Sequence, residues 1–197
     1  MKTNDYNAND MIVLVDVNDN EIGTDTKIGA HFRGALHRAF SLFVVSDNKM
    51  LVQKRAEGKY HSAGLWTNAC CSHPRAGEAL DAAVVRRCKE ELGLTIDSAF
   101  PLFSFVYRAD YGQVIEYEYD HVYLSLVDEV ELQPNPAEVS DVEWISFADL
   151  KNQLIDEPER FSCWFIIAAP RVLEAVDHTA GLGKGISNSV ASKLERD

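Results

Sequence analysis

The chain has 197 residues, of which 46% are hydrophobic and 25% are charged, and its formal net charge is −12. This length and composition fit a single soluble globular domain whose core needs no disulfides. The negative charge argues against a nucleic-acid partner and against adhesion to an anionic membrane. No apolar run approaches the roughly 18 residues needed to span a bilayer, so we expect no membrane insertion.

The cysteines and the N-terminus indicate a compartment. Of the four cysteines, Cys70 and Cys71 are adjacent and the other two are scattered, which is not the pattern of a disulfide framework. The N-terminus is polar and lacks the apolar core of a signal peptide. These features predict a protein of the reducing cytoplasm.

The first half of the chain favours strands separated by turns. Residues 1–9 are polar and are expected to be flexible. Residues 55–64 are expected to form a loop. Apolar and β-branched runs bounded by turn residues predict strands over residues 11–16, 21–26, 39–45 and 50–55, the last two forming a hairpin.

A helix over residues 78–92 dominates the second half. Leu80, Val84, Cys88 and Leu92 repeat every four residues, so they can bury one face, and Gly93 suits a left-handed helix end. Further predicted elements are strands over residues 100–109, 115–127 and 142–145, a helix capped by Ser146 and a last helix capped by Ser162, which Pro170 should kink or divide.

These elements predict an α+β fold around a mixed sheet. One domain is expected to span residues 10–178, followed by a flexible tail over residues 179–197 that is rich in glycine and serine.

The central helix carries a degenerate motif. It resembles the Nudix box, G-x5-E-x7-R-E-U-x-E-E-x-G-U, in which U is a bulky apolar residue. The chain departs from the box at Ser72, where glycine is usual, and at Arg87, where the hydrolases keep a glutamate that helps to hold magnesium. This resemblance implies a Nudix-like sheet sandwiched between helices. The matching positions are Glu78, Arg86, Glu90, Glu91, Gly93 and Leu94.

The segment before this helix indicates one particular family among proteins with a Nudix-like fold. Trp66-Thr67-Asn68, followed by Cys71-x-His73-Pro74, is similar to the type 1 isopentenyl-diphosphate delta-isomerases, which have a Nudix-like fold and a degenerate box. The similarity covers roughly residues 10–178. It implies an isomerase of isoprenoid biosynthesis that interconverts isopentenyl diphosphate and dimethylallyl diphosphate by metal-assisted protonation and deprotonation. We expect small isoprenoid diphosphates as its ligands and a monomer or homodimer as its state.

Five residues are candidates for a metal site. Glu116 and Glu118 are two apart on a predicted strand, so both side chains point to one face. Spacing alone would leave each histidine as a surface or core residue. The resemblance implies one site for Mn²⁺, Zn²⁺ or Mg²⁺ with a coordination position left open. Its ligands would be His31, His37, His73, Glu116 and Glu118, whereas His61, His121 and His178 match no family position and are expected to be structural or exposed.

Moving a carbon–carbon double bond requires one proton to be added and another to be removed. Two acid/base groups on opposite sides of the substrate can do this without a redox cofactor. By type alone Cys71 would be an inert buried cysteine, as we expect for Cys70. The resemblance instead implies that Cys71 and Glu118 are the acid/base pair, with Cys71 a plausible base if nearby cations lower its pKa. Tyr107 would lie beside the acid, and Trp164 would face the developing carbocation.

A diphosphate needs several cationic donors. The resemblance implies that Lys27, Arg55, Lys59 and Arg87 supply them. Glu91 would then hold a Mg²⁺ ion that bridges to the diphosphate, with the backbone carbonyl of Cys71 as a further ligand. Without the resemblance these cations would be surface charges, and Glu91 would form a helix-surface ion pair with Arg87.

Two other functions agree with parts of the sequence. A Nudix-type diphosphate hydrolase would use the box, but the cation at Arg87 cannot ligate magnesium. A non-catalytic protein with a structural zinc would use the histidines and cysteines, but the cysteines lack the paired C-x2-C spacing of such sites. The isomerase is therefore the leading prediction.

Overall fold

The computed structural model describes residues 9–128 and 130–180. Within these residues a nine-stranded mixed sheet forms the centre of the molecule. Its strands are β1 (Met11–Val15), β2 (Glu21–Thr26), β3 (His37–Ser46), β4 (Lys49–Arg55), β5 (Trp66–Asn68), β6 (Cys70–Ser72), β7 (Phe100–Asp110), β8 (Ile115–Leu126) and β9 (Val139–Ser146). The helices are α1 (Lys27–Arg33), α2 (Leu80–Leu92), α3 (Phe147–Asp156), the 3₁₀-helix η1 (Pro158–Arg160) and α4 (Cys163–Ala180).

The strand β3 is central to the sheet and is apolar on both faces, as expected for a strand that is covered on both sides. Along one edge it pairs in parallel with β8 over residues 37–45. Its other edge pairs in turn with β1, β6 and β4, all antiparallel. Because β3 bonds on both edges, it fixes where β6 and β8 lie.

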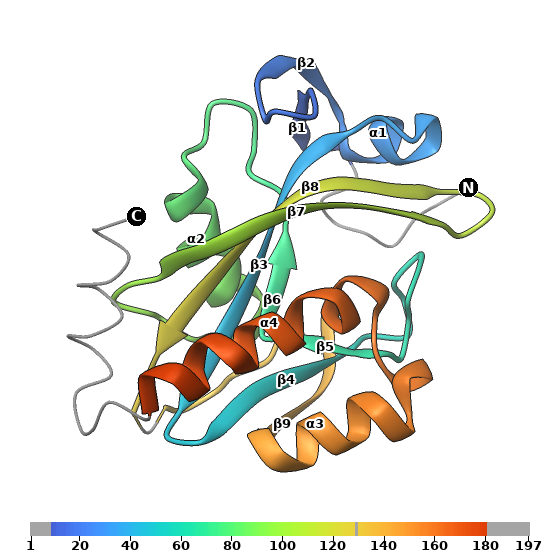
Figure 1. Cartoon of the computed structure of the whole chain (residues 1–197). Helices are drawn as coiled ribbons and strands as arrows, with labels where there is room; N and C mark the ends of the chain where they lie inside the picture. The colour runs from blue at the N-terminus through green and yellow to red at the C-terminus, as the bar shows by residue number, and fades with distance from the viewer. Residues whose placement is uncertain (1–8, 129, 181–197) are drawn as a thin grey trace.

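Helices cover both faces of the sheet, with α2 on one side and α4 on the other (Figure 1). On β3, Leu42 and Val44 pack in the same cluster as α2, whereas Phe43 and Val45 pack in the cluster that contains α4. This alternation follows from the two-residue period of a strand. The predicted α+β fold, a mixed sheet sandwiched between helices, is confirmed.

The central helix agrees closely with its prediction. It starts at Leu80, two residues later than expected, and ends at Leu92. Val84, Cys88 and Leu92 are fully buried. Gly93 has a φ of 65°, and its N–H donates to the carbonyl of Lys89, so this glycine ends the helix in the left-handed conformation that its position predicts.

The differences from prediction lie in short elements. The segment from Lys27 to Arg33, for which no element is predicted, is the helix α1, and the Thr26 side chain caps it by accepting from the N–H of Gly29. The stretch before α2, for which no strand is predicted, contains β6, which pairs with β3 and places Cys71 opposite Ser41. Strands of three residues offer too few positions for an alternating pattern, so periodicity does not reveal them.

The C-terminal helices follow the sequence with one exception. Ser146 caps α3 by accepting from the N–H of Asp149 at 3.1 Å, and Ser162 immediately precedes α4, its carbonyl accepting from the N–H of Ile166. The helix α4 continues through Pro170 and is not divided. The tail over residues 179–197 lies almost wholly outside the described residues, and the boundaries of the domain stay a prediction. None of the helices in residues 9–128 and 130–180 combines the length and apolarity needed to cross a membrane.

Two neighbouring valines of α2 test the packing of this face. Val84 is fully buried against the sheet, whereas Val85 is 36% exposed. We expect Val84→Ala to lower the free energy of unfolding by about 2 kcal/mol, because it removes buried methyl groups and leaves a cavity. Val85→Ala, the matched control, should change it by less than about 0.5 kcal/mol. Urea denaturation of both variants measures this, and equal effects would contradict the described face of α2.

Candidate active site

Five buried side chains from four separate segments converge near the start of β3. Each offers one nitrogen or oxygen atom, and these atoms all lie within 4.8 Å of one another. The group combines three imidazoles with two carboxylates. Its members are His31, His37, His73, Glu116 and Glu118, which are the five residues predicted to bind a metal.

The strand pairing explains why these residues meet. His37, the first residue of β3, is opposite Glu118 on β8. Glu116 lies two residues earlier on β8 and therefore shares the face of Glu118. His31 comes from the last turn of α1, and His73 directly follows β6, which pairs with the other edge of β3.

The outer nitrogens of two imidazoles are fixed by the backbone. His31 Nδ1 contacts the carbonyl of Lys27 at 2.5 Å, and His37 Nδ1 contacts the carbonyl of Ala35 at 2.8 Å. A carbonyl can only accept, so Nδ1 carries the hydrogen and Nε2 presents its lone pair to the cluster. Metal-ligating histidines are oriented in the same way in other proteins.

The nitrogen and oxygen atoms that face the centre of the cluster lie close together, but some of them lack hydrogen-bond partners. His31 Nε2 lies 2.9 Å from Glu116 Oε1, and His37 Nε2 lies 3.1 Å from His73 Nε2. His31 Nε2 and Glu116 Oε1 nevertheless have no hydrogen-bond partner with suitable angles among the described residues. Orphaned lone pairs that converge in this way fit a cation, because buried polar atoms otherwise need partners. The donor set therefore fits a divalent metal ion.

The protonation states of His73 and Glu116 agree with this interpretation. Burial lowers the pKa of His73 to about 4, so its imidazole is neutral. Burial acts against the ionised form of Glu116, but His61 and His31 outweigh it and hold the pKa of Glu116 well below its ordinary value. Neutral imidazoles and ionised carboxylates are the forms that bind metals.

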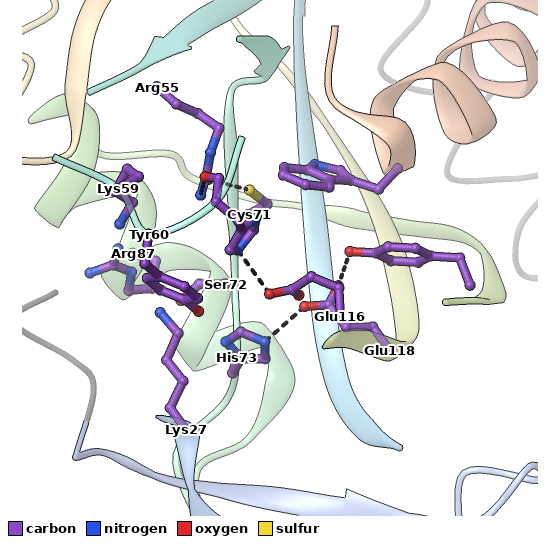
Figure 2. Close-up of a pocket in the computed structure, with 13 residues that line it drawn as sticks. Lys27, Arg55, Lys59, Tyr60, Cys71, Ser72, His73, Arg87, Glu116 and Glu118 are labelled. Atoms are coloured by element: carbon purple, nitrogen blue, oxygen red, sulfur yellow. Dashed lines mark hydrogen bonds and ion pairs between the residues drawn. The ribbon is translucent and has the colours of Figure 1, made fainter. Parts of the chain in front are cut away.

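The four predicted diphosphate-binding cations line one pocket together with three members of this group, His73, Glu116 and Glu118. Lys27, Arg55, Lys59 and Arg87 lie on one side, and the two glutamates lie on the other, with His73 between them (Figure 2). Arg55 and Arg87 are buried in spite of their charge. Because a buried charge is costly unless it is paired, these side chains are not the solvated surface cations that composition alone would suggest.

Each of two cations is held by carboxylates. Arg87 Nη2 lies 2.5 Å from Glu91 Oε1 and 3.4 Å from Glu138 Oε1. Lys59 Nζ lies 2.5 Å from the other oxygen of Glu138. Glu91 also accepts from Gln53 Nε2 at 3.0 Å. The pair of Arg87 with Glu91 is thus buried and belongs to a network, rather than lying on the helix surface.

The predicted acid/base residues face the same pocket. Tyr107 donates its hydroxyl to Glu118 Oε2 at 2.7 Å, and Cys71 Sγ lies 3.8 Å from Arg55 Nη1. Burial raises the pKa of Cys71 to about 12, although Arg55 opposes the shift. The cation near Cys71 therefore does not lower its pKa below the ordinary value, and the thiol is protonated. Trp164 lies in the pocket wall, with the Arg55 guanidinium 5.2 Å from the centre of its ring.

The sequence prediction assigned no place in the pocket to His61 and did not name Glu138. His61, expected to be structural or exposed, is buried and lines the pocket, and its Nε2 lies 2.8 Å from Glu116 Oε1. His121 lies elsewhere and pairs with Asp19, and the side chain of His178 is outside the described residues. Glu138 follows a Pro-Asn-Pro loop that carries no catalytic motif. The signal for His61 was its place two residues after Lys59, in a loop predicted to carry a diphosphate-binding cation.

Comparison with known proteins decides the family. A NUDIX domain model matches residues 35–165. The chain is 46% identical over 173 residues to an isopentenyl-diphosphate delta-isomerase of Photobacterium profundum, covering 85% of this chain and 94% of that protein. It is 48% identical over 159 residues to isopentenyl-diphosphate delta-isomerase 2 of Photorhabdus laumondii, covering 79% and 88%. The chain belongs to the isopentenyl-diphosphate delta-isomerase family.

A solved structure agrees on the fold. The crystal structure of DR0079 from Deinococcus radiodurans is similar, with a TM-score of 0.67 and 19% sequence identity, and the match covers 82% of this chain and 98% of that one. This likeness shows the Nudix fold alone. The degenerate box has a structural role here, since Arg86 binds both carboxylate oxygens of Glu78, at 2.6 and 2.7 Å. Arg87, where the hydrolase box has glutamate, lines the pocket instead.

The ligand set can be tested with two variants two residues apart. We expect His73→Ala to lose most of its bound divalent metal, because an imidazole nitrogen leaves the cluster. Cys71→Ala should retain the metal, since its sulfur is not among the five ligand atoms. Mass spectrometry of the metal content after dialysis checks both. Full occupancy in His73→Ala would refute the ligand set, and metal loss in Cys71→Ala would indicate sulfur ligation.

Proposed function

We propose that this chain interconverts isopentenyl diphosphate and dimethylallyl diphosphate in isoprenoid biosynthesis. The observation that carries the proposal is one pocket lined by Cys71, by four cations and by part of the metal group. The members of the metal group that line it are His73, Glu116 and Glu118, and His31 and His37 lie behind them within the same five-residue group. Membership of the isomerase family supports the same reaction.

The four cations of the pocket form the proposed diphosphate-binding site. Arg55, Lys59 and Arg87 come from β4, the loop that follows it and α2, and Lys27 comes from the start of α1. Guanidinium groups can hold a phosphate by two hydrogen bonds. We assign the diphosphate to this side of the pocket, with Glu91 and the carbonyl of Cys71 as the groups that would hold the accompanying Mg²⁺.

The hydrocarbon end then lies between the acid/base groups. Glu118, with Tyr107 donating to it, adds a proton to the terminal methylene carbon, and positive charge develops on the tertiary carbon. The face of Trp164 stabilises that charge, by up to ~2 kcal/mol where water is excluded. Cys71, from the opposite wall, removes a proton from the carbon next to the one that bears the diphosphate. One proton is gained and one is lost, so the substrate is isomerised without oxidation.

The second metal group concerns Glu118 directly. His31, His37, His73, Glu116 and Glu118 would hold Mn²⁺, Zn²⁺ or Mg²⁺, since their donors are nitrogen and oxygen. Such an ion would supply positive charge that fixes the Glu118 carboxylate in the pocket. The chain itself contributes the buried ligand set, and it excludes water from the place where the carbocation develops.

A product assay tests the reaction. Incubation of the purified protein with isopentenyl diphosphate and Mg²⁺ should yield dimethylallyl diphosphate and release no phosphate. A chelator should abolish turnover, and Mg²⁺ with a trace of Mn²⁺ should restore it. Nuclear magnetic resonance of the products and a phosphate assay measure the two outcomes. Phosphate release at the rate of substrate loss would favour a Nudix hydrolase. The present prediction is the opposite, because Arg87 stands where the hydrolase box has a glutamate.

The acid/base pair makes a separate prediction. We expect Cys71→Ala and Glu118→Gln each to lower kcat by about 10²–10⁴-fold, because each removes one proton-transfer group. Diphosphate binding should change much less, since the cations remain. Cys70→Ala is the matched control, because Cys70 is fully buried in the cluster beneath α2. A Cys71→Ala protein within about tenfold of the parent would remove Cys71 from the mechanism.

A further inference from the structure

One imidazole of the pocket belongs neither to the five-residue metal group nor to the predicted catalytic residues. His61 lies in the loop between β4 and β5, and its side chain is only 6% exposed. A buried polar side chain in a loop needs partners that hold it. The partners of His61 come from three different parts of the site.

The first partner is a metal-group carboxylate. His61 Nε2 lies 2.8 Å from Glu116 Oε1, the same oxygen that His31 Nε2 approaches at 2.9 Å. The five ligand atoms within 4.8 Å of one another do not include His61. His61 therefore reaches the group through Glu116 and not by facing the other four ligands.

Aromatic rings hold the imidazole in this position. Its ring stacks on Tyr111, with centroids 4.9 Å apart and planes inclined by 27°. Edge contacts with Tyr60 and Trp164 have centroid distances of 4.7 and 5.9 Å. The next residue, Ser62, has a φ of 49°, a left-handed backbone conformation that residues other than glycine adopt at a cost in free energy. The surrounding packing must stabilise this turn, which sends His61 inward.

The backbone of His61 reaches the diphosphate side. Its carbonyl accepts from Arg55 Nη2 at 3.3 Å. Lys59 lies two residues before His61 in the same loop. His61 thus connects Arg55 at the end of β4, and the loop that carries Lys59, to a carboxylate of the metal group on β8.

We propose that His61 is a positioning residue of the metal centre. It holds the Glu116 carboxylate without being a metal ligand itself, and it links the loop between β4 and β5 to that carboxylate. The inference rests on the proposed metal site. Carboxylate ligands commonly have such outer partners, whose loss lowers metal affinity by about 10–100-fold. A role in packing alone would need the rings but not the polar contact with Glu116.

Three substitutions at this position separate polar contact from packing. His61→Ala removes both, His61→Phe keeps a stacking ring without a nitrogen, and His61→Gln keeps an N–H that can reach Glu116. His121→Ala is the matched control, because His121 pairs with Asp19 away from the pocket. Each protein is stripped of metal and titrated with Mn²⁺, with free Mn²⁺ followed by electron paramagnetic resonance and folding checked by circular dichroism.

We expect the Kd for Mn²⁺ to rise about 10–100-fold in His61→Ala and His61→Phe. His61→Gln and His121→Ala should remain close to the parent. X-ray absorption of the Mn²⁺-loaded proteins should show the same number of nitrogen ligands in His61→Gln as in the parent.

Three results would overturn the proposal. Unchanged affinity in His61→Phe would reduce His61 to packing. Loss of one nitrogen ligand in His61→Gln would make His61 a direct ligand. A parent protein that binds no Mn²⁺ would refute the proposed metal site itself, which the parent titration alone reveals.

Discussion

The parallel pairing of β3 with β8 is the constraint on which the site depends. It sets His37 opposite Glu118, while β6 on the other edge of β3 sets Cys71 opposite Ser41. Glu118 and Cys71 therefore approach the pocket from strands on either side of β3. A slip of β8 by one residue would turn both its glutamates to the opposite face of the sheet. The burial of β3 under helices on both faces makes such a slip costly, so the packing of the core maintains the geometry of the proposed chemistry.

The charges of the pocket explain why a diphosphate would arrive with a cation. Arg87 contacts both Glu91 and Glu138, and Lys59 contacts Glu138, so the cations already have carboxylate partners. A polyanion must compete with these buried carboxylates for the same donors. A divalent ion beside Glu91 would offset that carboxylate and leave Arg87 to the phosphate oxygens. Glu138 keeps the two cations in place, since burying them unpaired would be costly.

Periodicity predicted the long elements, and resemblance predicted most of the site. The repeat of Val84, Cys88 and Leu92 gave the buried face of α2, because a packed helix must show this period. The five metal-group residues come from four separate segments. Spacing paired the two glutamates of β8, and only the family pattern joined them to the three histidines. His61 and Glu138 lie in loops, where no period constrains the sequence. Their contacts with the side chains of the site depend on the folded positions of these loops, which periodicity does not predict. The short strand that carries Cys71 was equally hidden, because its pairing with β3 and not its own sequence makes it a strand.

In the proposed mechanism, the acid/base pair of Glu118 and Cys71 must return to its starting state between turnovers. Burial and the nearby Glu116 raise the pKa of Glu118, but hydrogen bonds with His37 and His73 outweigh them, and the pKa lies below its ordinary value. The thiol of Cys71, with its raised pKa, keeps its proton. A carboxylate and a thiol are the pair left after Glu118 has given its proton and Cys71 has taken one. They are also the pair required for the reverse reaction. A new forward cycle therefore requires Cys71 to lose the proton that it took and Glu118 to regain one. The hydroxyl of Tyr107, 2.7 Å from the Glu118 carboxylate, is placed to relay the proton to Glu118.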